Sequence, residues 1–445
     1  MTFLLLLLAL LLSFADQSLL SPLLNPLLLD FFGDASNVVP LGWVSFVFTL
    51  VMAVSTVASG ILSDRGPRKR LLLAGCLLFG LASALTPLIP SGGAGYFLFF
   101  AGRALSGLGQ GAVLPAVFSM VGDTAAPARR GAAFGLVSMS MLVGRMAGFL
   151  TAGTLAHTWR TAYFLAGAMG LLLALALRFA REPRRGAREE ELRGALEAGA
   201  EYRFRIRRAD VRYLRSVRSN VWLILNFVDV VPGAILIFLI FKFMKDDHNM
   251  EAGPVNFIVF LVMVFGALGA LVFGRLGDAL FRRDRRGRVL LALACNAVPI
   301  VCLVFFITAD FRLPEGATLG RALAEPGVRV VLVSVVAAMF VNQGVNPNWY
   351  GTLTDINLPE HRATMVSLAS VMDMLGNALG PLVASYIVLL RGMRAALWAA
   401  LVVWALNIFL WLPVLRHVRR DLERRHNVLA GRAANPERTD AEPGG

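Results

Sequence analysis

The sequence predicts an all-α membrane protein whose twelve transmembrane helices form two pseudo-symmetric six-helix bundles. The first observation is composition: 57% of the 445 residues are hydrophobic, only 16% are charged, and the mean hydropathy is +0.67. A soluble globular chain of this length does not have such values. The second observation is a series of apolar segments of about 20 residues, the length that crosses a bilayer. The third is a set of motifs that occurs once in each half of the chain.

The first apolar segment runs from Leu4 to Ala15 and then meets Asp16. Ser13 and Ala15 stand where signal peptidase requires small residues, so a cleavable signal is one reading. No basic residue precedes Leu4, however, as a signal peptide would require. In addition, Phe14 and Asp16 have counterparts in the second half, Phe227 and Asp229. The segment is therefore predicted to be the first transmembrane helix, with Asp16 in its middle.

The remaining segments complete a symmetric arrangement around one polar stretch. The twelve predicted helices are centred near residues 16, 52, 80, 108, 143, 170, 230, 264, 300, 339, 376 and 404. We expect a bundle over 1–180, a basic cytoplasmic linker over 181–218, a second bundle over 219–415 and a disordered cytoplasmic tail over 416–445. The linker has too many charges to enter a bilayer, and either a solvated segment or a surface helix fits its composition.

Basic residues predict the orientation, because short loops rich in Lys and Arg remain in the cytoplasm. With twelve spans, 33 of the 43 basic residues fall on the side that holds both termini, and only seven fall on the other. The sequence therefore predicts a multi-pass protein of the bacterial inner (plasma) membrane with both termini in the cytoplasm. This distribution explains the net charge of +14 without a nucleic-acid partner.

Repeated motifs indicate that the two halves are copies of one six-helix unit. A Gly-x-Leu-x-Asp motif before a basic run occurs at Gly60–Asp64 and again at Gly274–Asp278. An Asp-x-x-x-Pro-x-x-Arg motif occurs at Asp123–Arg130 and at Asp355–Arg362. The same offset relates Gly144 and Gly148 to Gly376 and Gly380.

These features together resemble the major facilitator superfamily over essentially the whole chain. The segment Arg103–Gly111 is similar to its Arg-x-x-x-Gly-x-Gly-x-Gly motif in helix four. Within the superfamily, the segment Phe14–Pro22, Arg103 and the Arg181–Gly186 sequence resemble Spinster-type lysolipid and sphingolipid transporters. The Gly-Pro motif of drug antiporters is absent from helix five and occurs instead as Gly380-Pro381 on helix eleven, which disfavours that subfamily.

Asp16 and Arg103 are the first candidates for a functional role, because an ionisable group inside a bilayer is costly unless it is paired or faces a cavity. Counting about 1.5 Å per residue from opposite faces places both near the same depth. In the resembled superfamily helices one and four line one cavity, so we predict an Asp16–Arg103 ion pair. Protonation of Asp16 would release Arg103 to an anionic substrate. The alternative is a permanent pair that only fixes helix packing.

Further polar residues fall on predicted helices five, seven and eleven. Asp229 occupies the position equivalent to Asp16 and is predicted to be a second proton-coupling site or a cavity anchor. Arg145 is predicted to bind either a substrate head group or Asp373. Asp373 and Asn377 are predicted to bind substrate and share one helix face, as do the neighbouring glycines, which favour close helix packing.

Helix ten is predicted to end in a polar segment that contacts substrate through Asn342, Asn346 and Trp349. Asn342 and Asn346 lie one turn apart, and Pro347 predicts a kink. Amides beside aromatic rings suit an amphipathic ligand, and hydrogen bonds between helices are the alternative role.

A gating role is implied by the resemblance for the repeated loop motifs. The predicted gating residues are Gly60, Asp64, Arg65, Arg68, Gly274, Asp278, Arg130 and Arg362. Each Asp would bind a basic residue or a helix N-terminus in one conformation and release it in the other.

The predicted function is a secondary transporter that moves a small organic, anionic or amphipathic, lysolipid-like substrate by alternating access, coupled to protons. The alternatives are a drug or metabolite efflux antiporter, an uncoupled facilitator and a sensor of the same fold. No phosphate-binding Gly-x-x-x-x-Gly-Lys loop occurs, and no His or Cys spacing suits a metal or an intramembrane enzyme. We therefore expect no catalytic residue, metal or cofactor besides a proton gradient, a monomer, and membrane lipids and the substrate as partners.

Overall fold

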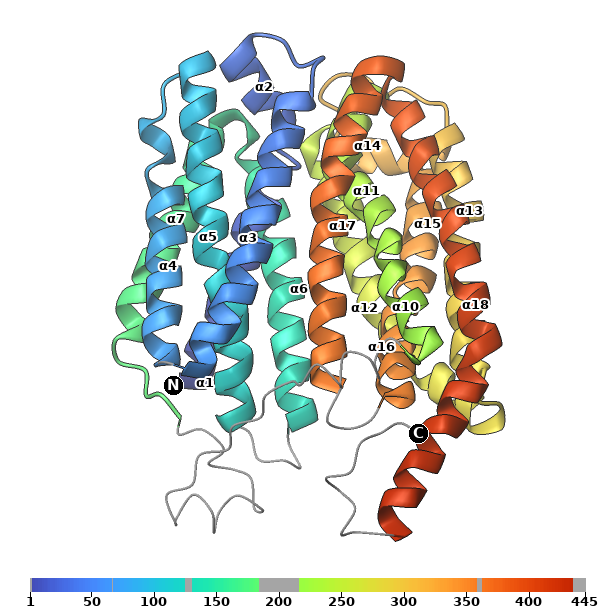
Figure 1. The fold of residues 1–445 in the computed structure, drawn as a ribbon. Coiled ribbons are helices and arrows are strands. Elements are labelled where there is room, and N and C mark those ends of the chain that lie inside the picture. Colours follow the sequence, from blue (N-terminus) through green and yellow to red (C-terminus); the bar gives the residue numbers. More distant parts are fainter. Residues whose placement is uncertain (1, 66, 125–129, 184–215, 358–361, 435–445) are drawn as a thin grey trace.

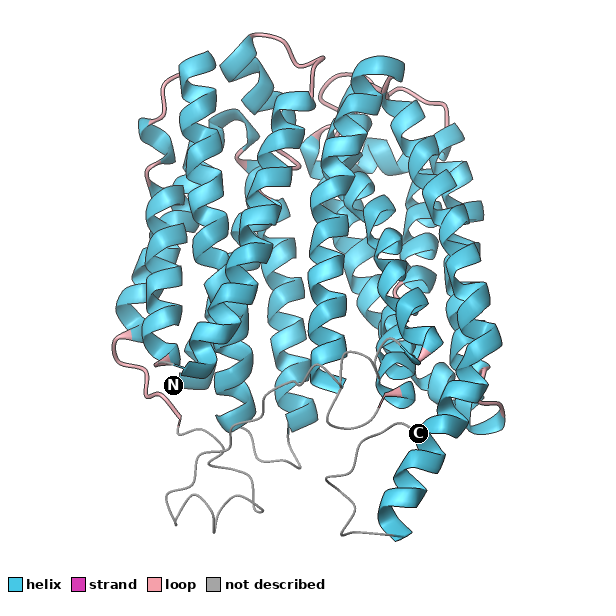
Figure 2. Cartoon of the chain, in the orientation of Figure 1, coloured by secondary structure: helices cyan, strands magenta, loops and turns pink. Residues whose placement is uncertain are grey.

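The computed structural model describes residues 2–65, 67–124, 130–183, 216–357 and 362–434. Within these ranges the chain consists of helices and loops (Figure 2). Eleven helical segments are long and apolar enough to cross a membrane, and Thr2–Ser18 is a shorter apolar helix. Together they match the twelve predicted spans in order and position, so the predicted fold class is confirmed.

The two halves form two bundles side by side (Figure 1). The N-terminal bundle contains α1 (Thr2–Ser18), α2 (Leu24–Phe32), α3 (Val39–Arg65), α4 (Arg68–Ala84), α5 (Gly93–Thr124), α6 (Arg130–Thr154) and α7 (Trp159–Leu177). The C-terminal bundle contains α10 (Arg218–Leu225), η4 (Asn226–Asp229), α11 (Val230–Asp246), α12 (Ala252–Arg283), α13 (Gly287–Thr308), α14 (Leu319–Ala324), α15 (Pro326–Asn342), α16 (Val345–Ile356), α17 (Arg362–Arg391) and α18 (Met393–Ala434).

Proline interrupts the first span of each bundle. Between α1 and α2 the chain forms turns at residues 19–23, because Pro22 has no N–H for the carbonyl of Ser18 and disfavours helical backbone at Ser21. In the seventh span a short 3₁₀ helix, η4, separates α10 from α11, and Pro232 lies in the first turn of α11. Asp16 and Asp229 both lie at these interruptions, where regular backbone hydrogen bonding ends.

The tenth span is also divided, between α15 and α16, at Gln343 and Gly344. Pro347 predicted a kink, and its missing N–H leaves the carbonyl of Gln343 without its helical donor. The span continues to Ile356 rather than ending near Tyr350.

The C-terminal tail differs from the prediction. Helix α18 continues past residue 416 to Ala434, so the segment predicted to be disordered is helical over most of its length. The part of α18 beyond residue 416 is held by the burial of Val418 and Leu422. The backbone N–H of Ser219 also donates a hydrogen bond to Asp421. Because this segment is rich in charged residues, its sequence gave no indication of this packing. The predicted linker lies mainly outside the described residues.

Contacts between the bundles concentrate at one end of the molecule. We call the end with the α3–α4 and α12–α13 connections (65–68 and 283–287) the basic end, and the other the opposite end. At the opposite end, one apolar cluster contains Leu27 and Tyr163 of the first bundle with Phe238 and Ala384 of the second. At the basic end, the two described apolar clusters each belong to a single bundle.

Polar contacts follow the same pattern. At the opposite end Lys242 Nζ donates to Asn25 Oδ1 at 2.6 Å and to Asp246 Oδ2 at 2.7 Å. Trp43 Nε1 donates to the hydroxyl of Tyr386 at 3.1 Å. The described contacts therefore close the opposite end between the two bundles.

His248, in the loop after α11, makes this end sensitive to acid. Its ring is buried, stacks on Phe311 with 4.2 Å between the ring centres, and donates through Nδ1–H to the Phe311 carbonyl at 2.9 Å, while Nε2 has no partner. Burial lowers the pKa of His248 below 6.5, although the hydrogen bond to the Phe311 carbonyl and the charges of Asp247 and Asp310 oppose this, and Arg394 adds to it. The folded protein therefore favours the neutral ring more strongly than the unfolded chain does.

We expect the melting temperature to fall as the pH drops below about 6.5, because the unfolded chain then binds a proton that the folded protein excludes. Thermal melts from pH 8 to pH 5 would measure this loss. The His248→Gln variant should show a smaller decline over that interval, and an equal decline in both proteins would contradict the assignment.

Candidate functional site

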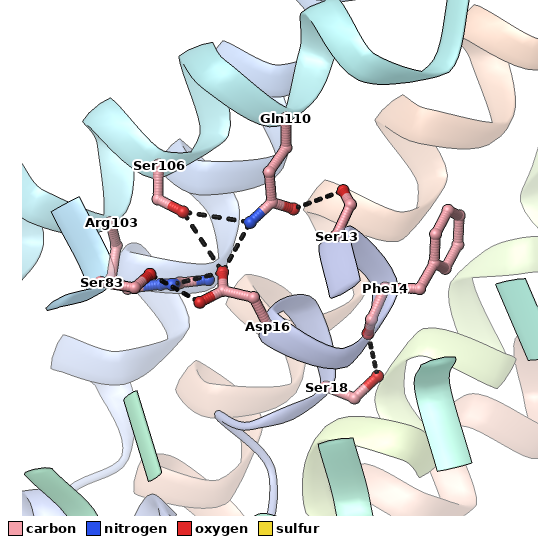
Figure 3. A network of polar contacts seen from close by, with 8 residues as sticks. All are labelled: Ser13, Phe14, Asp16, Ser18, Ser83, Arg103, Ser106 and Gln110. Atoms are coloured by element: carbon pink, nitrogen blue, oxygen red, sulfur yellow. Dashed lines mark hydrogen bonds and ion pairs between the residues drawn. The ribbon is translucent and has the colours of Figure 1, made fainter. Parts of the chain in front are cut away.

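Asp16 lies completely buried (0% exposed) near the end of α1, inside the N-terminal bundle. Its carboxylate accepts four side-chain hydrogen bonds, shown in Figure 3. The donors and their distances are Ser83 Oγ at 2.6 Å, Arg103 Nη1 at 2.8 Å, Ser106 Oγ at 3.2 Å and Gln110 Nε2 at 2.5 Å. Because an ionised carboxylate offers about four acceptor sites, this environment suits the charged form.

The ion pair predicted between Asp16 and Arg103 is therefore present. Arg103 is 4% exposed and lies between two aromatic rings, 4.5 Å from the centre of Phe48 and 5.1 Å from that of Tyr163. Stacking of a guanidinium on aromatic faces is favourable and holds its plane. The carboxylate and the two rings thus hold Arg103 inside the N-terminal bundle, and its release would require Asp16 to lose charge or move.

Three partners of Asp16 were not predicted from the sequence, namely Ser83, Ser106 and Gln110. Arg103, Ser106 and Gln110 are spaced i, i+3 and i+7 on α5, which places them on one helix face. This spacing was available in the sequence, whereas the contribution of Ser83 from α4 depends on tertiary packing. Gln110 also accepts a hydrogen bond from Ser13 at 3.3 Å, so the α1–α5 contact is polar over two turns.

Close packing of α6 fixes α1 from the other side. A Cβ at Gly144 would lie 2.2 Å from the Leu11 carbonyl oxygen, and one at Gly148 would lie 2.2 Å from that of Ala15. In the second bundle Gly376 and Gly380 contact η4 and α11 in the same way. The predicted packing role of these glycines agrees with these distances.

Asp229 has different neighbours from Asp16. Its Oδ1 accepts hydrogen bonds from Trp404 Nε1 at 2.7 Å and from Asn407 Nδ2 at 3.2 Å, both on α18. No described cation pairs with it. Asp373 of α17 lies one turn before Gly376, which packs against the Phe227 carbonyl oxygen of η4. The two halves therefore treat equivalent carboxylates differently.

Arg145 makes no ion pair with a described carboxylate, so the predicted partnership with Asp373 is absent from this conformation. Its guanidinium lies 5.6 Å from the ring centre of Phe14. Asn377 is exposed and donates within its own helix to the carbonyl of Asp373 at 3.0 Å. The head-group alternative for Arg145 stays a prediction.

The three candidate residues predicted on helix ten have different environments. Trp349 is 3% exposed and donates through Nε1 to the Leu223 carbonyl at 2.9 Å, which leaves it no free face for substrate in this conformation. Asn346 is exposed, and the Nδ2 atom of Asn342 is buried without a partner. The structure thus supports the alternative of helix contacts for Trp349 and not for the two amides.

The predicted gating residues lie at the basic end. Arg288 bridges Asp278, at 2.6 Å, and Asp355, and Gly274 packs on Pro347. Arg68 is buried and binds Glu182, Ser119 and the Pro183 carbonyl. A Cβ at Gly60 would meet open space. The side chains of Asp64, Arg65, Arg130 and Arg362 lie outside the described residues.

A cavity of about 950 Å³ lies between the bundles at the opposite end. Its lining includes Asn25, Asp30, Arg160, Lys242 and Phe241. No predicted substrate-binding residue lines it, so it is separate from the candidate site.

The family follows from comparison with known proteins. The model of the Major Facilitator Superfamily matches residues 6–313 and 225–436. The chain belongs to the Major Facilitator Superfamily. It is thus an integral, multi-pass membrane protein of a transporter family, which confirms the predicted family and disfavours the intramembrane enzyme.

Two curated relatives from the superfamily match most of the chain. The 3-(3-hydroxy-phenyl)propionate transporter of Escherichia coli (strain K12) is 25% identical over 379 residues, covering 83% of this chain and 84% of that protein. The class C tetracycline resistance protein of Escherichia coli is 26% identical over 410 residues, covering 90% and 92%.

Solved superfamily structures share the fold. A bacterial homolog of the human lysosomal transporter Spinster, in an inward-facing conformation, aligns with a TM-score of 0.75 and 19% identity, covering 94% of this chain and 97% of that one. The D-xylose-proton symporter aligns at 0.67 and 15% identity, covering 92% and 96%. The resemblance to the Spinster type is thus one of fold.

Proposed function

We propose that this superfamily member is a proton-coupled secondary transporter of small organic anions or anionic, lysolipid-like amphiphiles. The observation that carries the proposal is the Asp16–Arg103 ion pair, which is buried inside the membrane-spanning bundle. The Asp16 carboxylate also accepts hydrogen bonds from three neutral side chains. Such intramembrane ion pairs mark ion and substrate pathways by default.

Proton binding to Asp16 changes the balance of this site. A neutral carboxyl no longer offsets the cost of burying the Arg103 guanidinium, so Arg103 gains from contact with an anionic group. Substrate binding and protonation then favour the same rearrangement of α1 against α5. The first span is already interrupted at residues 19–23, so α1 can tilt relative to α2 there without loss of regular helical hydrogen bonds.

The relatives support the class of substrate. The Escherichia coli relative named for 3-(3-hydroxy-phenyl)propionate handles an aromatic carboxylate, which combines an anionic group with an apolar body. The unpaired Arg145 offers a second cation for such a ligand. The tetracycline resistance relative favours drug efflux as the second candidate function. This proposal also includes three features predicted from the sequence. They are an orientation with both termini in the cytoplasm, a location in the bacterial inner membrane and a monomeric state.

The test is transport in proteoliposomes under an imposed pH gradient. Lysophospholipid, 3-(3-hydroxyphenyl)propionate and tetracycline serve as substrates, and wild type is compared with Asp16→Asn and with Asp34→Asn, a carboxylate in an exposed loop. We expect gradient-driven accumulation of an anionic substrate by wild type and Asp34→Asn, and only exchange or downhill flux by Asp16→Asn. Equal, gradient-independent flux in all three proteins would reject coupling, and transport of tetracycline alone would favour the efflux alternative.

A further inference from the structure

The C-terminal bundle contains a carboxylate site without a resident cation. In the first bundle Arg103 neutralises Asp16. Counting back from the repeated Asp123 and Asp355 motifs, the position equivalent to Arg103 is Val335, an apolar residue that is 5% exposed. Asp229 receives only neutral donors, the Trp404 indole and the Asn407 amide. The repeat has therefore kept the carboxylate and lost the arginine.

A second carboxylate increases the imbalance. Asp373 of α17 lies one turn before Gly376, where a Cβ would stand 2.8 Å from the Phe227 carbonyl oxygen of η4, and among the described residues no side chain donates to the Asp373 carboxylate or pairs with it. Arg145 is not close enough to pair with either group. Two neighbouring negative charges inside a membrane-spanning bundle are unfavourable unless a positive group joins them.

Unsatisfied amide oxygens adjoin the same carboxylate. The Nδ2 atom of Asn407 donates to Asp229 and to Asn296, both at 3.2 Å, which determines the orientation of its amide. The Oδ1 atom of Asn407, whose side chain is 0% exposed, then has no partner beside the carboxylate. The Oδ1 atom of Asn226, in η4 itself, is likewise buried and unpaired. A buried carbonyl oxygen without a donor costs free energy.

The helix interruption adds to this set. The backbone changes from α-helix to the 3₁₀ helix η4 at Asn226, so Asn226 and Asp229 both lie within the interruption. Carbonyl oxygens at interrupted helices and carboxylates are the ligands by which membrane proteins hold sodium ions. All the unsatisfied groups here are hard oxygen atoms.

We propose that Asp229, Asp373 and the amide oxygen of Asn407 form a sodium-binding site in the C-terminal bundle. One Na⁺ neutralises one of the two charges, and the indole and amide donors stabilise the other. A proton alone would satisfy one carboxylate oxygen and leave the amide oxygens unpaired, whereas a metal ion accepts several oxygen ligands together. This site goes beyond the proposed function, because it lies in the other bundle from Asp16.

The test is Na⁺ binding to purified, detergent-solubilised protein at pH 8, with choline chloride holding ionic strength constant. We expect Na⁺ to raise the melting temperature saturably and to bind as ²²Na⁺. The Asp229→Asn and Asp373→Asn variants should each raise the dissociation constant at least tenfold. Asn407→Ser, which removes no charge, should raise it several-fold, and Asp34→Asn, which removes a carboxylate in an exposed loop, should leave it unchanged.

Other outcomes would overturn the proposal. These are absence of Na⁺ binding to wild type, binding that survives both carboxylate variants, or an equal response to K⁺ or to Ca²⁺. Size-exclusion elution as a single peak establishes that each variant is folded. Because binding is measured without transport, failure of the sodium site is distinguishable from failure of proton coupling at Asp16.

Discussion

Replacing Arg103 by leucine is expected to destabilise the protein by about 3–5 kcal/mol and to abolish transport, because it leaves the Asp16 carboxylate buried without a cation. Asp16 is 0% exposed, so water cannot replace the lost partner. Thermal melts and flux in proteoliposomes measure the two effects. The Arg103→Lys variant should recover only part of the stability, since lysine lacks the planar group that stacks on Phe48 and Tyr163.

A second ion pair provides the matched control. Arg160 lies 2.8 Å from Asp30, the same separation as Arg103 from Asp16, but these side chains are 27% and 22% exposed. Arg160→Leu should cost clearly less than Arg103→Leu, because water still reaches both groups of this pair and screens their interaction. The double variant Arg103→Leu with Asp16→Asn should regain stability without regaining coupling, because no buried charge remains. Equal losses at Arg103 and Arg160 would show that burial of the pair has no energetic role.

The sequence was sufficient for features that depend on the bilayer and on duplication. A hydrocarbon core demands long apolar helices, so the twelve spans were readable from hydropathy. Because ionisable residues are rare in such helices, Asp16 and Arg103 stood out. Their pairing followed from their similar depth together with the resemblance, which places helices one and four at one cavity. The repeats then placed Asp229 at the matching interruption of the seventh span.

Features that depend on side-chain packing were not readable. Trp349 was predicted to contact substrate, but an aromatic ring in an apolar helix can equally pack against neighbouring helices. In the structure its indole N–H donates to the Leu223 carbonyl, so it occupies a packing position. Arg145 was assigned Asp373 as one of two partners because helix packing does not require a cation, yet the sequence does not specify the rotation of either helix about its axis. The helical course of α18 beyond residue 416 depends on contacts with Ser219 that no local pattern encodes.

The second large effect concerns the contact between bundles. In the described residues, apolar clusters and hydrogen bonds join the halves at the opposite end, whereas the basic end has a separate cluster in each half. Rocking about a central site requires this closed end to open in the other state. A covalent link there should therefore arrest the cycle.

Gly153 of α6 and Asn256 of α12 are suited to such a link. A Cβ at Gly153 would lie 2.9 Å from the Asn256 Cγ atom, and the two residues belong to different bundles. With Cys76, Cys295 and Cys302 replaced by serine, the Gly153→Cys, Asn256→Cys pair should form a disulfide on oxidation. We expect the oxidised protein to lose at least about nine-tenths of its flux, and reduction to restore it.

The single-cysteine variants, treated with the same oxidant, control for damage by oxidation and for the loss of the Gly153 contact. Mass spectrometry or gel mobility after proteolysis gives the cross-linked fraction, which should equal the inactive fraction at each oxidation time. Full transport at complete cross-linking would mean that α6 and α12 stay together throughout the cycle. The bundles would then have to open elsewhere, at the α3–α17 contact where Trp43 donates to Tyr386, and a link between those helices would become the decisive variant.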